Sequence, residues 1–415
     1  MDNKYIYGTG ENKRFLEELN RDLIRFGRRF PSPGGSAYHL GDDGTPWPEY
    51  DRMCYVTCRM SHVYTIGAML GYEDCEPLVD ACLKGLAGEL NDKENGGWYP
   101  GLDKDDQPLP DKLCYAHAFV ILAASSACLI GRPGAKELLD RAIEVYDRFF
   151  WNEEEGLSCD FWDTAFTVKD GYRGLNANMH TVEAFLAAAD VTGDETYRVR
   201  AGRIIAHVLE WGERNGWRLP EHFNAAWQPD YEFNAANRED PFKPYGATPG
   251  HGLEWARLIT QWALSTYRGQ DGKARPYIEA AEKLCRTALT DAWNCDGAPG
   301  IVYTVDWEGK PVAHDRMHWV LMEAIDTTSV LYRVTGDRWY ADFYATLMEY
   351  CDRYVIDHVN GSFFHQMDRN NRVIGTVWAG KDDLYHAFQM TLIPYCEDMS
   401  LSIAPAVFRA CREGK

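Results

Sequence analysis

One imidazole and one carboxyl group lie three residues apart in the stretch 248–255, which reads TPGHGLEW. Pro249 and Gly250 interrupt the preceding structure and an apolar helical pattern follows. This places His251 at the first turn of a helix and Glu254 one turn deeper on the same face. The unpaired N–H groups of a helix start favour a neutral imidazole that can accept a proton, and a nearby carboxylate can orient the ring. The stretch therefore predicts an acid–base site, with a capping histidine and a surface glutamate as the plainer alternative.

A histidine recurs at similar spacing along the whole chain. Successive members of the series are 55, 63, 71, 67 and 68 residues apart, and each lies near the start of a helical pattern. The series consists of His62, His117, His180, His251, His318 and His386. If their helices form an inner ring, the first turns face one mouth, and we expect the six imidazoles to converge on one cavity. Six unrelated histidines, partly buried in the core, are the alternative.

Helical periodicity accounts for most of the chain and supplies the elements that would hold these groups. An amphipathic helix is expected at 12–26, followed by a Gly/Pro loop at 31–50. Further helices are expected at 54–70, 76–90, 113–130, 135–150, 179–192, 195–213, 251–267, 274–292, 316–335, 338–356 and 383–393. Short stretches between them, such as 96–99, could form small β-hairpins.

Glycines at regular intervals reveal an internal repeat. Gly193 within VTGDETY matches Gly336 within VTGDRWY, and Gly71, Gly131 and Gly269 hold similar positions between two helices. A glycine of this kind ends a helix in a left-handed cap, and the chain then turns into an antiparallel partner. The repeat unit is therefore a helix pair.

Six such pairs closed into a ring predict an all-α fold, an (α/α)6 barrel with short β-hairpins in its loops. We expect a single catalytic domain over residues 1–415. A linear solenoid is the alternative, but the ends of the chain lack polar capping repeats.

The composition restricts the class of partner. The 415 residues carry a net charge of −20 without a basic cluster, which argues against nucleic acid and anionic membranes. The start has no apolar stretch of signal-peptide length, and no run approaches about 20 apolar residues, so a cytoplasmic protein is expected. The 12 cysteines contain no Cys-x-x-Cys pair and are interpreted as buried free thiols. Charge and size are compatible with a monomer or a homo-oligomer.

The side chains around the histidines suit a carbohydrate, because sugars need dense hydrogen bonding and flat aromatic faces. Arg59 is a candidate clamp for a sugar hydroxyl or an anion, with a surface arginine as the alternative. Trp98, Trp227 and Trp378 could supply aromatic faces, although a single tryptophan is more often a packing residue.

Metal chemistry is a weaker interpretation of the same residues. His180 and Glu183, like His251 and Glu254, have the spacing of paired metal ligands. No HExxH motif is present, and the pattern of further carboxylates seen in di-metal bundles is missing. We expect no metal and no cofactor.

Five motifs, in the same order and over nearly the whole chain, resemble the N-acylglucosamine 2-epimerase superfamily, especially its aldose–ketose isomerase branch. They are TCRMSH at 57–62, YAHAF at 115–119, NANMH at 176–180, PGHGLEW at 249–255 and GKDDLYH at 380–386. Any one motif would be weak, but the five together are specific. The resemblance implies an (α/α)6 barrel, a monosaccharide substrate and no metal.

The resemblance also implies roles for individual residues. The two catalytic histidines of the family match His251 and His386. Its sugar-contacting residues match Arg59, Tyr115, Asn176, His180, Glu254, Trp319, Glu323 and Gln366. Tyr55 stands where the first inner helix of the family has a tryptophan.

Asp382 bears on the choice of sugar. At this position the sulfoquinovose isomerases of this family have a sequence that resembles Lys-Gln-Asp, and their glutamine helps to hold the sulfonate. A carboxylate facing a sulfonate costs on the order of 1–4 kcal/mol at about 4 Å. A neutral hexose is therefore favoured, with sulfoquinovose as an alternative.

The expected reaction is reversible conversion of D-mannose, or a related hexose, to D-fructose through a cis-enediol(ate). We expect His386 to carry the proton from C2 to C1, and His251, backed by Glu254, to open the ring and act on the opposite side. Arg59 and His180 would stabilise the enediolate oxygen. A sugar 2-epimerase with the same two histidines is the main alternative. A glycosidase with two carboxylates and a non-catalytic sugar-binding protein are the others.

Overall fold

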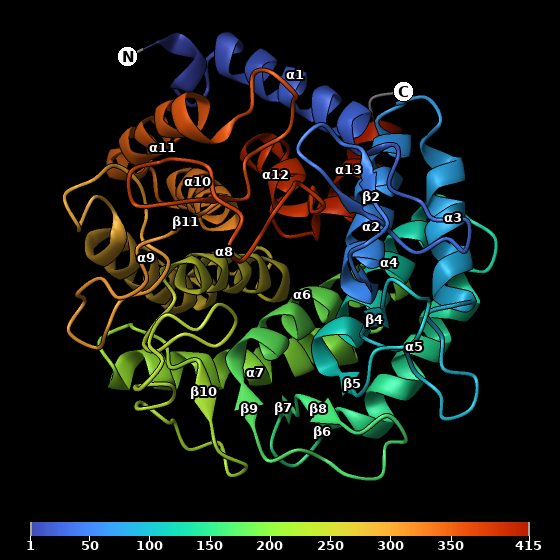
Figure 1. Cartoon of the computed structure of the whole chain (residues 1–415). Helices are drawn as coiled ribbons and strands as arrows, with labels where there is room; N and C mark the ends of the chain where they lie inside the picture. Colours follow the sequence, from blue (N-terminus) through green and yellow to red (C-terminus); the bar gives the residue numbers. More distant parts are fainter. Residues whose placement is uncertain (1, 414–415) are drawn as a thin grey trace.

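Two concentric rings of helices form the computed structural model, which describes residues 2–413 (Figure 1). The inner ring contains α2 (Cys54–Met69), α4 (Cys114–Leu129), α6 (Leu175–Thr192), α8 (Pro249–Thr266), α10 (His318–Thr335) and α12 (Tyr385–Met390). The outer ring contains α1 (Gly10–Gly27), α3 (Cys75–Ala87), α5 (Ala135–Phe149), α7 (Glu195–Arg214), α9 (Asp271–Ala292) and α11 (Arg338–Tyr350). The chain alternates between the rings, so each inner helix has an antiparallel outer partner, and α1 serves α12. The predicted (α/α)6 barrel is confirmed.

Short elements connect these helices. The remaining helical elements are η1 (Asn3–Tyr5), the π-helical turn η2 (Cys351–Val355), η3 (Ile393–Tyr395) and α13 (Ile403–Glu413). The strands are β1 (His39–Leu40), β2 (Pro46–Trp47), β3 (Arg52–Met53), β4 (Gly101–Leu102), β5 (Lys112–Leu113), β6 (Trp151–Asn152), β7 (Leu157–Ser158), β8 (Phe161–Trp162), β9 (Arg173–Gly174), β10 (His222–Phe223), β11 (Arg316–Met317) and β12 (Gln366–Met367). They form antiparallel two-stranded pairs: β1–β2, β3–β4, β5–β8, β6–β7, β9–β10 and β11–β12.

The strand pairs fix where the inner helices begin. β3, β5, β9 and β11 each run directly into an inner helix, at the end of the barrel that we call the mouth. The first residue of each of these helices donates its N–H to a carbonyl in the loop of the next repeat. The acceptors are Pro100 for Cys54, Asp160 for Cys114, Glu221 for Leu175 and His365 for His318, at 2.8 to 3.0 Å. Neighbouring repeats are thereby held in register around the mouth.

Buried ion pairs reinforce the same loops. A cation just before an inner helix pairs with an aspartate of the preceding hairpin, and the pairs are Lys112–Asp92, Arg316–Asp296 and Lys381–Asp357. Each of these six side chains is at most 3% exposed. Removing one member would leave a buried charge, so the pairs set the loop geometry firmly.

The glycine repeat has the predicted structural role. All five glycines have left-handed backbone conformations, with φ between 65° and 82°. Gly193 and Gly336 are the C-caps of α6 and α10. The 12 cysteines are all free, as predicted, but burial holds for only eight of them: Cys295 is exposed, and Cys128, Cys396 and Cys411 are half-buried.

Several helix boundaries differ from the periodicity, most of all at α11, which ends at Tyr350 rather than at residue 356 because the chain continues as the π-helical turn η2. α6 begins at Leu175, four residues before the predicted start, because β9 delivers the chain there already aligned with the ring. α12 spans only Tyr385–Met390 rather than 383–393, and the chain then turns into the separate 3-10 helix η3, which holds Pro394 in its first turn. Within residues 2–413 we find no helix that combines the length and apolar character needed to cross a membrane.

Candidate active site

His251 and His386 meet at the ring of Trp319. These residues lie in the first turns of α8, α12 and α10, so three inner helices present them at the mouth. The imidazole centroids are 5.1 and 5.9 Å from the indole centroid. A Cβ at Gly250 would come within 2.6 Å of the Trp319 ring, so this glycine permits the close approach of the two helices.

Glu323 orients His386. Nδ1 of His386 lies 2.9 Å from Oε1 of Glu323, and Arg257 donates to both oxygens of that carboxylate at 2.9 and 3.2 Å. Burial raises the pKa of Glu323, but the charge of Arg257 and the bond to His386 outweigh it and lower the pKa to about 2. An ionised carboxylate can only accept. The proton of neutral His386 therefore sits on Nδ1, and Nε2 holds the free lone pair.

The carboxylate beside His251 is Glu221, and this corrects the expectation that Glu254 backs it. Nδ1 of His251 lies 2.9 Å from Oε2 of Glu221, whose backbone is fixed by the bond from Leu175. Glu254 extends from the next turn of α8 but reaches toward His180 and Arg257, at 3.8 and 3.7 Å. The i, i+3 spacing along a helix did not specify the partner, because the ring turned toward the neighbouring loop.

We expect Glu221→Gln to lower kcat by roughly 10²-fold or more, because the amide can present an N–H to Nδ1 and favour the wrong tautomer. KM should change little, and the pH–rate profile should shift, since Glu221 acts through His251. Initial rates across pH test this expectation. If the variant lost activity only because less protein folds, and the folded part kept the wild-type pH–rate profile, the expectation would be wrong.

His180 forms a third histidine–carboxylate pair. Its Nδ1 lies 3.3 Å from Oε2 of Glu183, and Tyr385 donates its hydroxyl to the other oxygen. Burial raises the pKa of Glu183, but its bonds to His180 and Tyr385 and the charge of Arg257 bring it well below the usual value. Burial lowers the pKa of His180 to about 4. His180 is therefore neutral near pH 7 and offers a lone pair on Nε2, which suits a sugar hydroxyl better than an enediolate oxygen.

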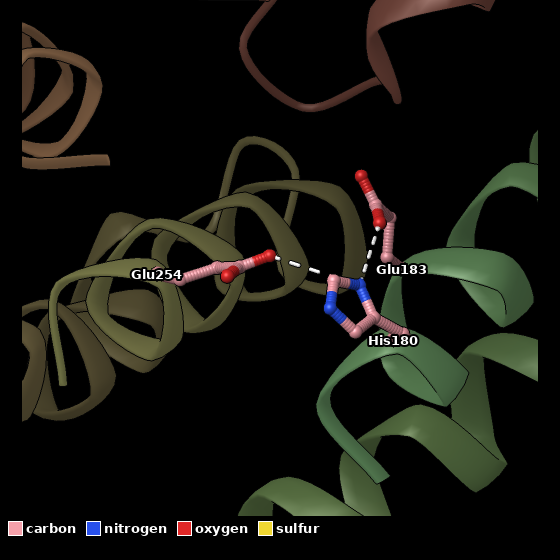
Figure 2. Close-up of side chains that lie close together, drawn as sticks. All are labelled: His180, Glu183 and Glu254. Carbon is pink, nitrogen blue, oxygen red and sulfur yellow. Dashed lines mark hydrogen bonds and ion pairs between the residues drawn. The ribbon is translucent and has the colours of Figure 1, made fainter. Parts of the chain in front are cut away.

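Glu254 lies between these pairs and is the unusual carboxyl group of the site. Figure 2 shows its side chain extending from α8 toward the His180 ring, with Glu183 on the other side. Glu254 is 1% exposed, and neither oxygen has a hydrogen-bond partner within residues 2–413. Burial and the charge of Glu323 raise its pKa well above the usual value. Glu254 is therefore a carboxyl group of the site with unused hydrogen-bonding capacity.

Arg59 is buried and paired rather than free. It forms an ion pair with Asp383 and donates to the Tyr115 hydroxyl at 2.7 Å. Its guanidinium also lies over the Phe119 ring, 4.5 Å from the centroid. Burial raises the pKa of Tyr115, so its hydroxyl keeps its proton. Tyr115 is thus a hydrogen-bond donor polarised by Arg59. Because Asp383 already balances the charge of Arg59, this arginine is not a free group for binding an anion.

Two expected sugar contacts occupy different settings. Asn176 is exposed at the start of α6, at the mouth. Gln366 in β12 is fully buried and uses its whole amide: Nε2 donates to Asp315 and Thr376, and Oε1 accepts from the N–H groups of Val377 and Trp378. Gln366 therefore holds the loop at 376–378, and the structure does not offer it as a free group.

The six histidines do not all converge, so this expectation was wrong for three of them. His117 is a core residue: Nδ1 bonds to the Leu113 carbonyl and Nε2 accepts from Trp98 N–H. His318 stacks on His365, with centroids 4.0 Å apart. His62, in the ninth position of α2, lies deeper and bonds to Ser126.

Most of the expected loop aromatics are packing residues. Trp98 is fully buried and donates to the Leu86 carbonyl, and Trp227 packs on Trp211 and Phe223. Trp378 packs edge-on against the stacked His318–His365 pair. Tyr55 lies edge-to-face against Tyr115, 5.4 Å between centroids.

Asp382 is engaged by histidines on the mouth loops. His39 Nδ1 lies 3.2 Å from one oxygen, and His365 Nδ1 lies 3.6 Å from the other. Burial lowers the pKa of His39, but the bond to Asp382 outweighs it and the net pKa is raised. His39, from a separate mouth loop, can thus partly balance the charge of this carboxylate.

Two groups of three side chains have the donor types for a cation, His180–Glu183–Glu254 and Glu254–Glu323–His386. Both groups share Glu254. The guanidinium of Arg257 lies within 4 Å of two of the carboxylates and supplies the positive charge that a cation would bring. That guanidinium would repel a divalent cation at this place.

The sequence as a whole was then compared with known proteins. Residues 34–390 match the family model described as N-acylglucosamine 2-epimerase (GlcNAc 2-epimerase), which is most of the chain. The chain belongs to the N-acylglucosamine 2-epimerase family. Every site residue described above, from Arg59 to His386, lies within the segment that matches this family.

Relatives within the family include proteins named D-mannose isomerase. The one from Thermobifida fusca is 40% identical over 400 residues, which cover 95% of this chain and 96% of the relative. The one from Pseudomonas cannabina pv. alisalensis is 40% identical over 357 residues, covering 85% and 84%. A crystal structure of a D-mannose isomerase has a TM-score of 0.85 and 26% identity, covering 94% of this chain and 99% of that one.

Sequence analysis did not identify Glu221 or Arg257, although Glu221 bonds to His251 and Arg257 bonds to Glu323. Arg257 lies within the apolar pattern of a helix, and nothing in that pattern indicates a role for a charged residue. Glu221 occupies the loop position held in other repeats by Pro100, Asp160 and His365, which accept from the first inner-helix residue. Alignment of the repeats at these loops would have pointed to it.

Proposed function

We propose that this protein is a metal-free aldose–ketose isomerase that interconverts D-mannose and D-fructose through a cis-enediol(ate). The observation that carries the proposal is the pair His251 and His386, each oriented by its own carboxylate and both set against Trp319. The relatives named D-mannose isomerase supply the sugar.

His386 is the base in this mechanism. Its Nε2 lone pair removes the C2 proton of the open-chain aldose, which leaves an enediolate and an imidazolium. Glu323 stabilises that imidazolium, because it stays ionised and bonds to Nδ1. The same Nε2 returns the proton to C1, and C2 becomes the ketone.

His251 acts on the opposite side of the sugar. Its Nε2 takes the O1 proton of the pyranose and passes it to O5 as the C1–O5 bond breaks, which opens the ring and leaves the imidazole neutral. In the isomerisation step the same Nε2 takes the proton of the C2 hydroxyl and delivers it to O1. Glu221 keeps Nδ1 protonated throughout these transfers.

The remaining groups bind the sugar. The Tyr115 hydroxyl, polarised by Arg59, donates to the developing enediolate oxygen. Glu254 and the Nε2 lone pair of His180 bond to sugar hydroxyls, and Asn176 contacts the sugar at the mouth. Trp319 presents an aromatic face to the C–H groups.

A sugar 2-epimerase is the second candidate, because two bases on opposite faces of C2 can also invert that carbon. The family description favours it. A glycosidase receives no support, since it needs two carboxyl groups free to act on the substrate. Here Glu183, Glu221 and Glu323 are each bonded to a histidine and Asp382 lies 3.2 Å from His39, so Glu254 is left without a second free carboxyl group among these side chains.

A panel of sugars tests the proposal. The purified protein is incubated separately with mannose, glucose, N-acetylmannosamine and sulfoquinovose, and the products are separated by chromatography. We expect mannose and fructose to interconvert. Glucose from mannose without fructose would establish the epimerase instead, and no turnover of any of the four would overturn the enzymatic assignment for these sugars.

A further inference from the structure

A cavity lies under the active site because the last inner helix is short. α12 has 6 residues, whereas the other inner helices have 16 or 18. η3 and the segment leading into α13 line the space that remains. Glu183 and Arg257 line the cavity on the side of the active site, and Ile403, Ala404 and Pro405 line it from α13.

His62 has an unused acceptor at this cavity. Ser126 donates its hydroxyl to the Leu122 carbonyl at 2.9 Å, so it must accept from Nδ1 of His62 at 2.8 Å. The ring is 1% exposed, and burial lowers its pKa to about 4, so it is neutral. Nε2 of His62 consequently holds a lone pair, and no group among the described residues donates to it. Buried acceptors of this kind are normally satisfied.

The size and lining of the cavity decide which molecule can donate a hydrogen bond to Nε2 of His62. Its volume is about 40 Å³. One water needs about 10–15 Å³ of such space, so roughly three fit, and a sugar or cofactor does not. Besides His62, the lining includes Gln261, Gln389 and Ser402. A water requires two to four polar partners, and this wall provides them.

We propose that this chamber is a built-in binding site for a cluster of about three water molecules, one of which donates to Nε2 of His62. The cluster hydrates the lower side of Glu183 and Arg257, two charged groups that also support the histidine pairs above. The short α12 is thus what admits water to the centre of the barrel.

A crystal structure of the full chain that resolves ordered solvent tests the proposal directly. We expect water density in the chamber, with one oxygen about 3 Å from Nε2 of His62. A chamber without density that takes up xenon under pressure would be dry and apolar, and the proposal would be wrong. A side chain donating to Nε2 would overturn it equally.

Stability of variants gives a second test. Ala404→Leu fills the chamber from α13 and should lower Tm by several degrees, because the water is expelled. In a His62→Phe background the same change should cost less, since the stranded acceptor is gone. Ala410→Leu, on the exposed side of α13, is the matched control and should leave Tm nearly unchanged. An equal loss in both backgrounds, or a gain in both, would contradict the proposal. Neither readout depends on sugar turnover.

Discussion

His386→Asn should lower kcat by about 10²–10⁴-fold while the protein stays folded. The asparagine amide can still donate to Glu323, so the buried carboxylate keeps a partner, but the lone pair that removes the C2 proton is lost. KM should change little, because the loss falls on the proton transfer rather than on binding. Initial rates of fructose formation and thermal unfolding of the same preparations provide the measurement.

The matched control for this prediction is His358→Asn. His358 is exposed in a loop, and its Nε2 lies 2.8 Å from the backbone carbonyl of Asp352 and 3.3 Å from its carboxylate. Its replacement should leave both kcat and Tm unchanged. If His386→Asn retained more than about a tenth of the wild-type rate, His386 would not be the base.

Arg257→Met should cost about 3–5 kcal/mol of unfolding free energy. Arg257 is 5% exposed and bonds to both oxygens of Glu323. Its removal leaves that carboxylate buried without a cation. The negative charge of Glu323, no longer offset by Arg257, then also raises the pKa of Glu254 further. The pKa of Glu323 should rise, so His386 loses its ionised partner and kcat falls too. Denaturant unfolding measures the stability.

Two further variants separate charge from packing. Adding Glu323→Gln to Arg257→Met removes the stranded charge and should recover part of the stability without recovering activity. Arg268→Met breaks the exposed pair with Asp398 and should cost less than about 1 kcal/mol. A loss for Arg257→Met as small as for Arg268→Met would show that the buried pair carries little of the stability.

The ring of helices was predictable because its signals are local. Each helix–glycine–helix unit repeats within a short stretch, and left-handed caps such as Gly193 and Gly336 have a strong residue preference. The positions of His251 and His386 at helix starts follow from the same local patterns. The length of α12 was misjudged because apolar residues continue to Ile393, although the chain there leaves the helix.

The partners of the site residues could not be predicted in the same way. His251 and Glu221 lie 30 residues apart on a helix and a loop, and only the closed ring brings them together. The same holds for Arg257 and Glu323, 66 residues apart. His117 looked like a site residue, yet its ring nitrogens serve the backbone of its own repeat.

The most direct test of the two-histidine mechanism is proton NMR of the chelator-treated protein with mannose in D₂O. The account predicts fructose with deuterium entering at C1, because the proton held on His386 exchanges with solvent between C2 and C1 during the enediol stage. Activity should be unchanged by chelation, since Arg257 provides the positive charge at the carboxylates. Loss of turnover on chelation, with recovery on adding a divalent metal, would contradict the account. A metal-dependent reaction that forms fructose without any deuterium at carbon would contradict it as well.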